Sequence, residues 1–175
     1  MAEPAADRLG VVVMAYGTPA RPEDIEAYYT HIRRGRPPSP EQLAALTARY
    51  EALGGTSPLA ERTEAQRQAL ADALQVRRPG GTRVVLGQKH AAPFIEDAVA
   101  ALADDGIDRL VGLVLAPHYS GASVGEYLAR LTAAADERGL ASAGVTSWHL
   151  EPAYLGFLAG ALDGYVNAVD AGRLW

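Results

Sequence analysis

The 175-residue chain has a formal net charge of −5 and 49% hydrophobic residues, which gives no reason to expect nucleic acid or an anionic membrane surface as its main partner. With no cysteine, it can form no disulfide, zinc–thiolate site or iron–sulfur cluster of its own. The polar N-terminus lacks the features of a signal peptide, and no apolar run is long enough to span a bilayer. We therefore expect one cytoplasmic domain without a transmembrane segment.

Four short apolar runs predict β-strands, at residues 9–14, 83–86, 110–115 and 143–147. The first and third are continuous, which is typical of strands buried on both faces. Helical patterns separate the runs, and strands that alternate with helices favour a parallel sheet with crossover connections. We expect an α/β fold with three layers: an open parallel sheet of about four strands, flanked by helices as in flavodoxin-like proteins.

Sequence signals for helix starts and stops lie between these strands. Capping-box patterns, with Ser or Thr three residues before Gln or Glu, begin at Ser39, Thr63 and Ser123. Apolar residues at helical spacing predict a helix over residues 25–32. Another helix is expected to begin near Pro93 and to end at Gly106, and a last helix is predicted over residues 154–169. The segment 22–75 is long for one crossover and is predicted to hold three helices, and such insertions commonly carry function.

The loops that follow the strands are the candidate site, because open parallel sheets bind ligands beyond the carboxyl ends of their strands. They cover residues 15–21, 87–93, 116–123 and 148–152. In the first loop, Tyr16 places a phenol at the site edge, and Gly17 allows a sharp turn. A tyrosine there can donate, accept or ligate a metal when deprotonated, or it can simply pack on the first helix.

A basic cluster, Arg33-Arg34-Gly35-Arg36, marks the end of a predicted helix. Cations favour helix C-termini, so a solvated helix end is one interpretation. Three arginines exceed what a cap requires, and guanidinium groups bind carboxylates in a bidentate way. The alternative is therefore a polycarboxylate ligand, to which Arg49 and Tyr50 on the next helix can contribute.

The remaining loops offer weaker signals. The turn Gly54–Leu59 presents backbone N–H groups and the Ser57 hydroxyl, but it lacks the lysine of a nucleotide-binding P-loop and is otherwise an ordinary turn. Lys89 and His90 follow the second strand and His118 follows the third, so we expect two histidines at adjacent strand ends, able to bind a metal or move protons. We treat His31 and His149 as structural or surface residues. The ring of Tyr127 suits a flat ligand or ordinary packing.

Five motifs, in the order and spacing of a known family, make this chain resemble the N-terminal half of a ferrochelatase, the family that inserts ferrous iron into a porphyrin. These motifs are MAYGTP, YYTHIRRGRPP, GGTSPL, GQKHAAPFIEDAV and LAPHYSGASVGEY. The resemblance extends over about residues 10–166. The Tyr-Gly-Thr-Pro version after the first strand is similar to the branch that uses coproporphyrin III. The resemblance thus implies a chelatase-like fold and a role in haem biosynthesis.

The resemblance also implies residue roles. Tyr16 would be the axial partner of the metal in the product, and Lys89 and His90 would be auxiliary residues lining the cleft. The macrocycle and its propionates would be bound by Arg33, Arg49, Tyr50, Ser57 and Tyr127. Ferrous iron and coproporphyrin III would be substrates, no cofactor would be permanently bound, and other haem-pathway enzymes would be partners.

The sequence departs from the family in its length. Full-length ferrochelatases have two similar α/β halves, and their catalytic histidine and glutamate lie in the second half, after a Ser-Ala-His-Ser-Leu-Pro pattern that does not occur here. No catalytic residue is therefore assigned in this chain. We expect a flexible N-terminus (1–8), a chelatase-like domain (9–150), then a linking helix and truncated end (151–175), with the C-terminal domain absent. An uncovered inter-domain face would favour self-association.

Three functions follow from these observations. The first is a ferrochelatase half that binds the porphyrin but is inactive or weakly active alone. The second is a small homodimeric metal chelatase, in which His90 and His118 replace the family's metal ligands. The third is a porphyrin-binding module without catalysis, which needs only Tyr16 and the arginines.

Overall fold

The computed structural model describes residues 8–170 and shows four parallel strands in one sheet. They are β1 (Leu9–Ala15), β2 (Thr82–Gln88), β3 (Arg109–Val114) and β4 (Ala141–Val145), in the spatial order β2-β1-β3-β4. The predicted open parallel sheet of about four strands is confirmed. Most of the predicted flexible N-terminus (1–8) lies outside the described residues. The same is true of the last five residues of the predicted segment 151–175.

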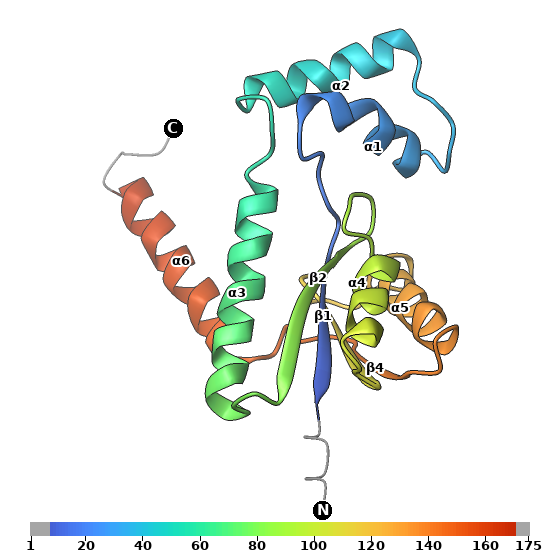
Figure 1. Ribbon diagram of the computed structural model, residues 1–175. Coiled ribbons are helices and arrows are strands. Elements are labelled where there is room, and N and C mark those ends of the chain that lie inside the picture. The colour runs from blue at the N-terminus through green and yellow to red at the C-terminus, as the bar shows by residue number, and fades with distance from the viewer. Residues whose placement is uncertain (1–7, 171–175) are drawn as a thin grey trace, which may run out of the picture.

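Helices cover both faces of the sheet, which gives the three expected layers (Figure 1). Helices α4 (Ile95–Asp104) and α5 (Glu126–Asp136) lie on one face, and α3 (Leu59–Arg77) and α6 (Pro152–Asp170) lie on the opposite side. The main core fills the space between the sheet and α4 and α5. Its largest fully buried members include Met14, Ile95, Leu102, Leu110 and Leu131.

The central strand β1 is buried on both faces, as predicted, but β3 is not. In β3, Leu110 and Val114 are buried on the α4–α5 side, whereas Val111 and Leu113 on the opposite side are only half-buried. The reason is the placement of α3, which packs against β2 and leaves this part of the sheet less covered. The prediction of a doubly buried third strand is therefore wrong for one of its faces.

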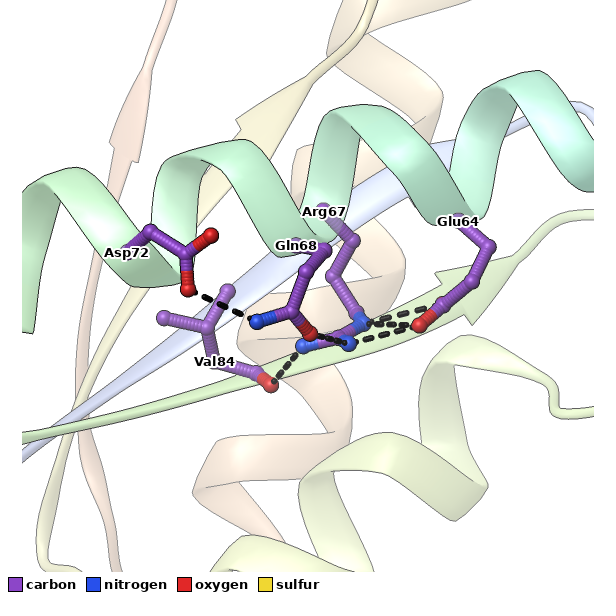
Figure 2. A network of polar contacts seen from close by, with 5 residues as sticks. All are labelled: Glu64, Arg67, Gln68, Asp72 and Val84. Atoms are coloured by element: carbon purple, nitrogen blue, oxygen red, sulfur yellow. Dashed lines mark hydrogen bonds and ion pairs between the residues drawn. The ribbon is translucent and has the colours of Figure 1, made fainter.

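One arginine of α3 joins that helix to the edge strand β2 (Figure 2). Arg67 donates to the Val84 carbonyl at 3.1 Å and is held in place by Glu64 at 2.6 Å and by the side-chain oxygen of Gln68 at 2.7 Å. Gln68 in turn donates to Asp72 at 2.8 Å. A carbonyl on an edge strand has no neighbouring strand on its outer side, so Arg67 satisfies an acceptor that would otherwise face solvent.

Helices α1 (Ile25–Ile32) and α2 (Pro40–Ala52) project beyond the carboxyl ends of the strands, after a short 3₁₀ turn at Pro22–Asp24 (Figure 1). The capping box predicted at Ser39 is present: its hydroxyl accepts from the Gln42 N–H at 3.3 Å, and the Gln42 side chain accepts from the Ser39 N–H at 3.0 Å. With α3, these helices confirm that the segment 22–75 holds three helices.

Two other predicted capping boxes are wrong. Helix α3 begins at Leu59, so Thr63 lies inside it, where its hydroxyl donates to the Leu59 carbonyl at 2.7 Å. Ser123 lies within a π-helical turn, Gly121–Gly125, that runs directly into α5. There the Ser120 carbonyl accepts from the Ser123 and Gly125 N–H groups, so backbone groups replace the side-chain cap.

None of the helices in the described part of the chain combines the length and the apolar character that crossing a bilayer requires.

Candidate functional site at the carboxyl edge of the sheet

A cleft of about 1020 Å³ opens at the carboxyl edge of the sheet, between α1, the loop after β2 and the start of α5. This is the edge at which ligands were expected. Charged and aromatic side chains dominate its lining, including Tyr16, His31, Arg34, Lys89, His90 and Arg130. Its volume is at the upper end for small-molecule sites and can accommodate a large ligand.

Tyr16 lies at the mouth of this cleft because it follows directly on β1. Gly17 turns the chain with a φ of +91°, and a side chain there would meet Ala91 at 3.0 Å. The Tyr16 ring is 45% exposed and lies 4.6 Å from the His90 ring, centroid to centroid. Partial burial, with Glu126 nearby, raises the pKa of the phenol, so it stays protonated near neutral pH.

Lys89 is largely buried, with 8% of its surface exposed, and is neutralised by Glu126. Its Nζ lies 2.7 Å from the Glu126 carboxylate and 5.2 Å from the centroid of the Tyr127 ring. The hydrogen bond from Lys89 lowers the pKa of Glu126. Sequence reasoning placed Glu126 in a helix cap and missed this ion pair, because its partner lies 37 residues away.

Arg130, which sequence reasoning also missed, fixes the loop that carries Lys89 and His90. It donates to the Lys89 carbonyl at 2.8 Å and forms a bidentate pair with Glu96 at 2.8 and 2.6 Å. The bond from Arg130 lowers the pKa of Glu96. No local signal identifies this arginine, because both of its partners are distant in sequence.

His90 forms a pair with His31 inside the cleft. Their Nδ1 atoms lie 3.0 Å apart, so one ring donates and the other accepts. Burial, with His31 and Lys89 close by, lowers the pKa of His90 to about 4, and this imidazole is therefore neutral at neutral pH. His31 is exposed, as expected for a surface residue, and its contact with His90 is one that the sequence did not indicate.

The prediction that His90 and His118 lie at adjacent strand ends is also wrong. Strand β1 lies between β2 and β3, so the two histidines follow strands that are not neighbours. His118 instead stacks on His149, with ring centroids 4.9 Å apart. Among residues 8–170, no group of three or more His, Cys, Asp or Glu side chains is arranged to hold a metal ion.

A second, smaller cavity of about 310 Å³ borders Tyr16 from another side and contains Tyr127. Its lining also includes the apolar residues Met14, Leu59 and Val114, of which only Leu59 is exposed. Burial raises the pKa of Tyr127 to about 12. Tyr16 therefore borders two cavities, one lined by many charged side chains and one lined mostly by apolar residues, and Tyr127 lines the apolar one.

The remaining predicted residues line neither of these cavities. Arg33 ends α1, with its guanidinium carbon 5.5 Å from the Tyr29 ring centroid, whereas the adjacent Arg34 lines the cleft. Arg49 is exposed on α2, and the Tyr50 hydroxyl lies 3.2 Å from that of Thr18. Ser57 accepts from the Leu59 N–H at 3.2 Å at the start of α3. The structure thus places Tyr16, Lys89 and His90 together, and Arg33, Arg49 and Ser57 apart from them.

The sheet, its flanking helices and the cleft at its carboxyl edge define an α/β protein of the chelatase-like class. A family model described as Ferrochelatase matches residues 8–173. The chain belongs to the ferrochelatase family.

Relatives bear a more specific name. The chain is 48% identical, over 95% of its length, to "Coproporphyrin III ferrochelatase 1" of Bacillus anthracis, of which it covers 54%. It is 51% identical, over 86% of its length, to "Coproporphyrin III ferrochelatase" of Geobacillus kaustophilus (strain HTA426), of which it covers 48%. The chain therefore spans about half the length of the curated relatives it matches.

Proposed function

We propose that this chain is the porphyrin-binding half of a cytoplasmic ferrochelatase that inserts ferrous iron into coproporphyrin III during haem biosynthesis. The observation that carries the proposal is the cleft beside Tyr16, in a chain that is 48% identical to coproporphyrin III ferrochelatases. Ferrous iron and the porphyrin are the substrates.

In this proposal Tyr16 presents its phenol to the metal face of the ring. Its exposure at the junction of two cavities supports this role. Tyr127 and the exposed Leu59, in the apolar cavity, provide wall surface for a flat macrocycle, whereas Met14 is fully buried in the core. The arginines Arg33 and Arg49, with Tyr50 and Ser57, bind the propionates at the rim, and Arg34 in the cleft wall adds a further cation.

Metal insertion also requires a base that removes two pyrrole protons. Tyr16 cannot serve as the base because its raised pKa keeps the phenol protonated near neutral pH, and Lys89 is occupied by Glu126. His90 is neutral and is the auxiliary base among the proposed cleft residues, but its pKa of about 4 makes it a weak base, and it faces His31 rather than a carboxylate. We therefore propose that this chain binds the tetrapyrrole and that efficient insertion needs the family's histidine and glutamate, which we assign to no residue here.

The test is a two-stage titration. Coproporphyrin III is titrated into the purified chain while its absorption spectrum is followed, and ferrous iron is then added without oxygen. We expect saturable binding and insertion close to the uncatalysed rate, because general-base help typically contributes about 10²–10⁴-fold.

Two outcomes would contradict this proposal. Absence of binding would refute the porphyrin site, and insertion at an enzymatic rate would instead favour a small homodimeric chelatase. One observation favours this second candidate. Helix α6 has exposed apolar side chains, among them Phe157 and Leu162, which could form the interface of a homodimer.

A further inference from the structure

The two histidines of the cleft form a partition between two cavities. Ala27, His31 and His90 line both the 1020 Å³ cleft and a neighbouring cavity of about 420 Å³. The neighbouring cavity extends towards Thr18, Tyr28 and Phe94, and so lies behind the pair as seen from Arg130 and Lys89. Anything that passes from one cavity to the other at this point meets both imidazoles.

The spacing of the pair matches that of two ligands on one metal ion. The Nδ1 atoms are 3.0 Å apart, and the ring planes are inclined by 75°. Two nitrogens bound at about 2.1 Å to one metal, with a right angle between the bonds, lie about 3.0 Å apart. A metal ion can therefore replace the shared proton after a rotation of the two rings, without a change in their spacing.

Contacts from outside keep the two rings beside each other. His31 stacks on Phe94 with 5.1 Å between ring centroids, and His90 lies against Tyr16 at 4.6 Å. The backbone N–H of His90 also donates to the Tyr16 carbonyl at 3.0 Å. A pair that is held in this way loses little freedom when it binds an ion.

The nearest cations on the cleft side are compensated. Lys89 is paired with Glu126 at 2.7 Å, and Arg130 is paired with Glu96 at 2.6 Å. A further cation of the cleft wall, Arg34, is outnumbered by two further carboxylates of the same wall, Glu23 and Glu26. The surroundings of the pair therefore do not repel a divalent cation strongly.

We propose that His31 and His90 bind a divalent first-row metal ion through their Nδ1 atoms, at the passage between the two cavities. Imidazole nitrogens suit Fe²⁺, Co²⁺ and Zn²⁺. The two histidines leave the other coordination positions to water, so the ion is bound weakly and exchanges readily. Such a site suits a metal in transit, and the identification of that metal as the ferrous substrate rests on the proposed function.

The test uses Co²⁺ alone, without porphyrin. Isothermal titration and the visible d–d spectrum of Co²⁺ report binding to the full chain and to His31→Ala and His90→Ala. Each variant should bind at least about tenfold more weakly, since even outer-sphere changes at metal sites cost 10–100-fold. The matched control is His118→Ala, from the other histidine pair, which should bind Co²⁺ like the unchanged chain.

A second measurement protects the test against variants that fail to fold. In the unchanged protein, paramagnetic shifts from bound Co²⁺ should be largest for the ring signals of His31 and His90, and much smaller for His118 and His149. Equal Co²⁺ affinity in all variants, shifts centred elsewhere, or no binding at millimolar Co²⁺ would each overturn the proposal. Because no porphyrin is present, these outcomes are independent of coproporphyrin binding, which tests the proposed function separately.

Discussion

Tyr16, Lys89 and His90 come together because each follows a strand that ends at the same edge of the sheet. Such residues can be identified from sequence, since strand ends are marked by the apolar runs before them. Glu126, Arg130 and His31 could not be found in this way. Their partners are 34 to 59 residues distant, and only the folded chain brings them into contact.

Arg33 is the residue on which the proposed propionate contacts can be tested. Arg33→Ala should weaken coproporphyrin III binding by about 1–3 kcal/mol, the range for a charge-assisted contact, which is about 5- to 150-fold in affinity. The loss should be smaller for a porphyrin with fewer carboxylates. Spectroscopic titration measures both, with Arg77→Ala in the last turn of α3 as the control. Equal losses for the two porphyrins would show that Arg33 does not contact propionates.

The ion pair between Glu96 and Arg130 should make the stability of the protein depend on pH. Arg130 lowers the pKa of Glu96 in the folded protein. The contribution of Glu96 to the free energy of unfolding is therefore present above its unfolded pKa of about 4.3, and it is lost as the pH falls through the lower pKa of the folded state. The carboxylate is half exposed, so Glu96→Gln should cost less than about 1 kcal/mol at pH 7. Urea unfolding at pH 7 and pH 3 measures the difference in unfolding free energy between the Glu96→Gln variant and the unchanged protein. This difference should be smaller at pH 3.

The control for this measurement is Glu61→Gln, because Glu61 is an exposed carboxylate in the first turn of α3. It should show no comparable change between the two pH values. An identical pH dependence for the Glu96 and Glu61 variants would contradict a stabilising pair with Arg130.

At the scale of elements, the strands and most helices follow from apolar runs and local caps. The capping box at Ser39 was predictable because both partners lie within four residues. The starts of α3 and α5 were not, because the Thr63 and Ser123 patterns also fit positions inside or before a helix. The half-covered face of β3 could not be predicted for another reason. A continuous apolar run indicates a buried strand, but it does not indicate which helix packs on each face of that strand.

Gly112 in β3 explains how closely α5 approaches the sheet. A methyl group at this position would lie 2.5 Å from Leu131 and 2.7 Å from Met14, both fully buried. Gly112→Ala should therefore reduce the free energy of unfolding by about 1–3 kcal/mol through overpacking. Thermal or urea unfolding measures this loss.

Gly160→Ala is the matched control, since its added methyl in α6 meets nothing within 4 Å. It should leave stability unchanged or increase it by up to about 1 kcal/mol, because alanine favours helix more than glycine does. A Gly112→Ala protein as stable as the Gly160→Ala protein would refute the close packing of α5 on β3.

For the whole molecule, the main expectation concerns the uncovered side of α6. Phe157, Leu162 and Tyr165 are 69%, 64% and 64% exposed, which is unusual for large apolar side chains on one helix. We expect the isolated chain to self-associate through α6, and Phe157→Asp with Leu162→Asp should shift it towards monomer. Sedimentation velocity over a range of concentrations measures this.

Val76→Asp on α3 is the control, because Val76 is 83% exposed but lies on a different helix. This change should not alter the association. A chain that stays monomeric at every concentration, or a response to Val76→Asp equal to that of the α6 changes, would contradict association through α6.

The central position of β1 has a consequence for how the chain is made. Leu9 pairs with Thr82 on one side and with Arg109 on the other, so the partners of this first strand are synthesised about 70 and 100 residues later. At a synthesis rate of about 5–20 residues per second, β3 follows after about 5–20 s. Until β2 has been synthesised, the Val11–Val13 stretch has no strand to pair with, so it is the segment that a chaperone on the nascent chain would be expected to bind.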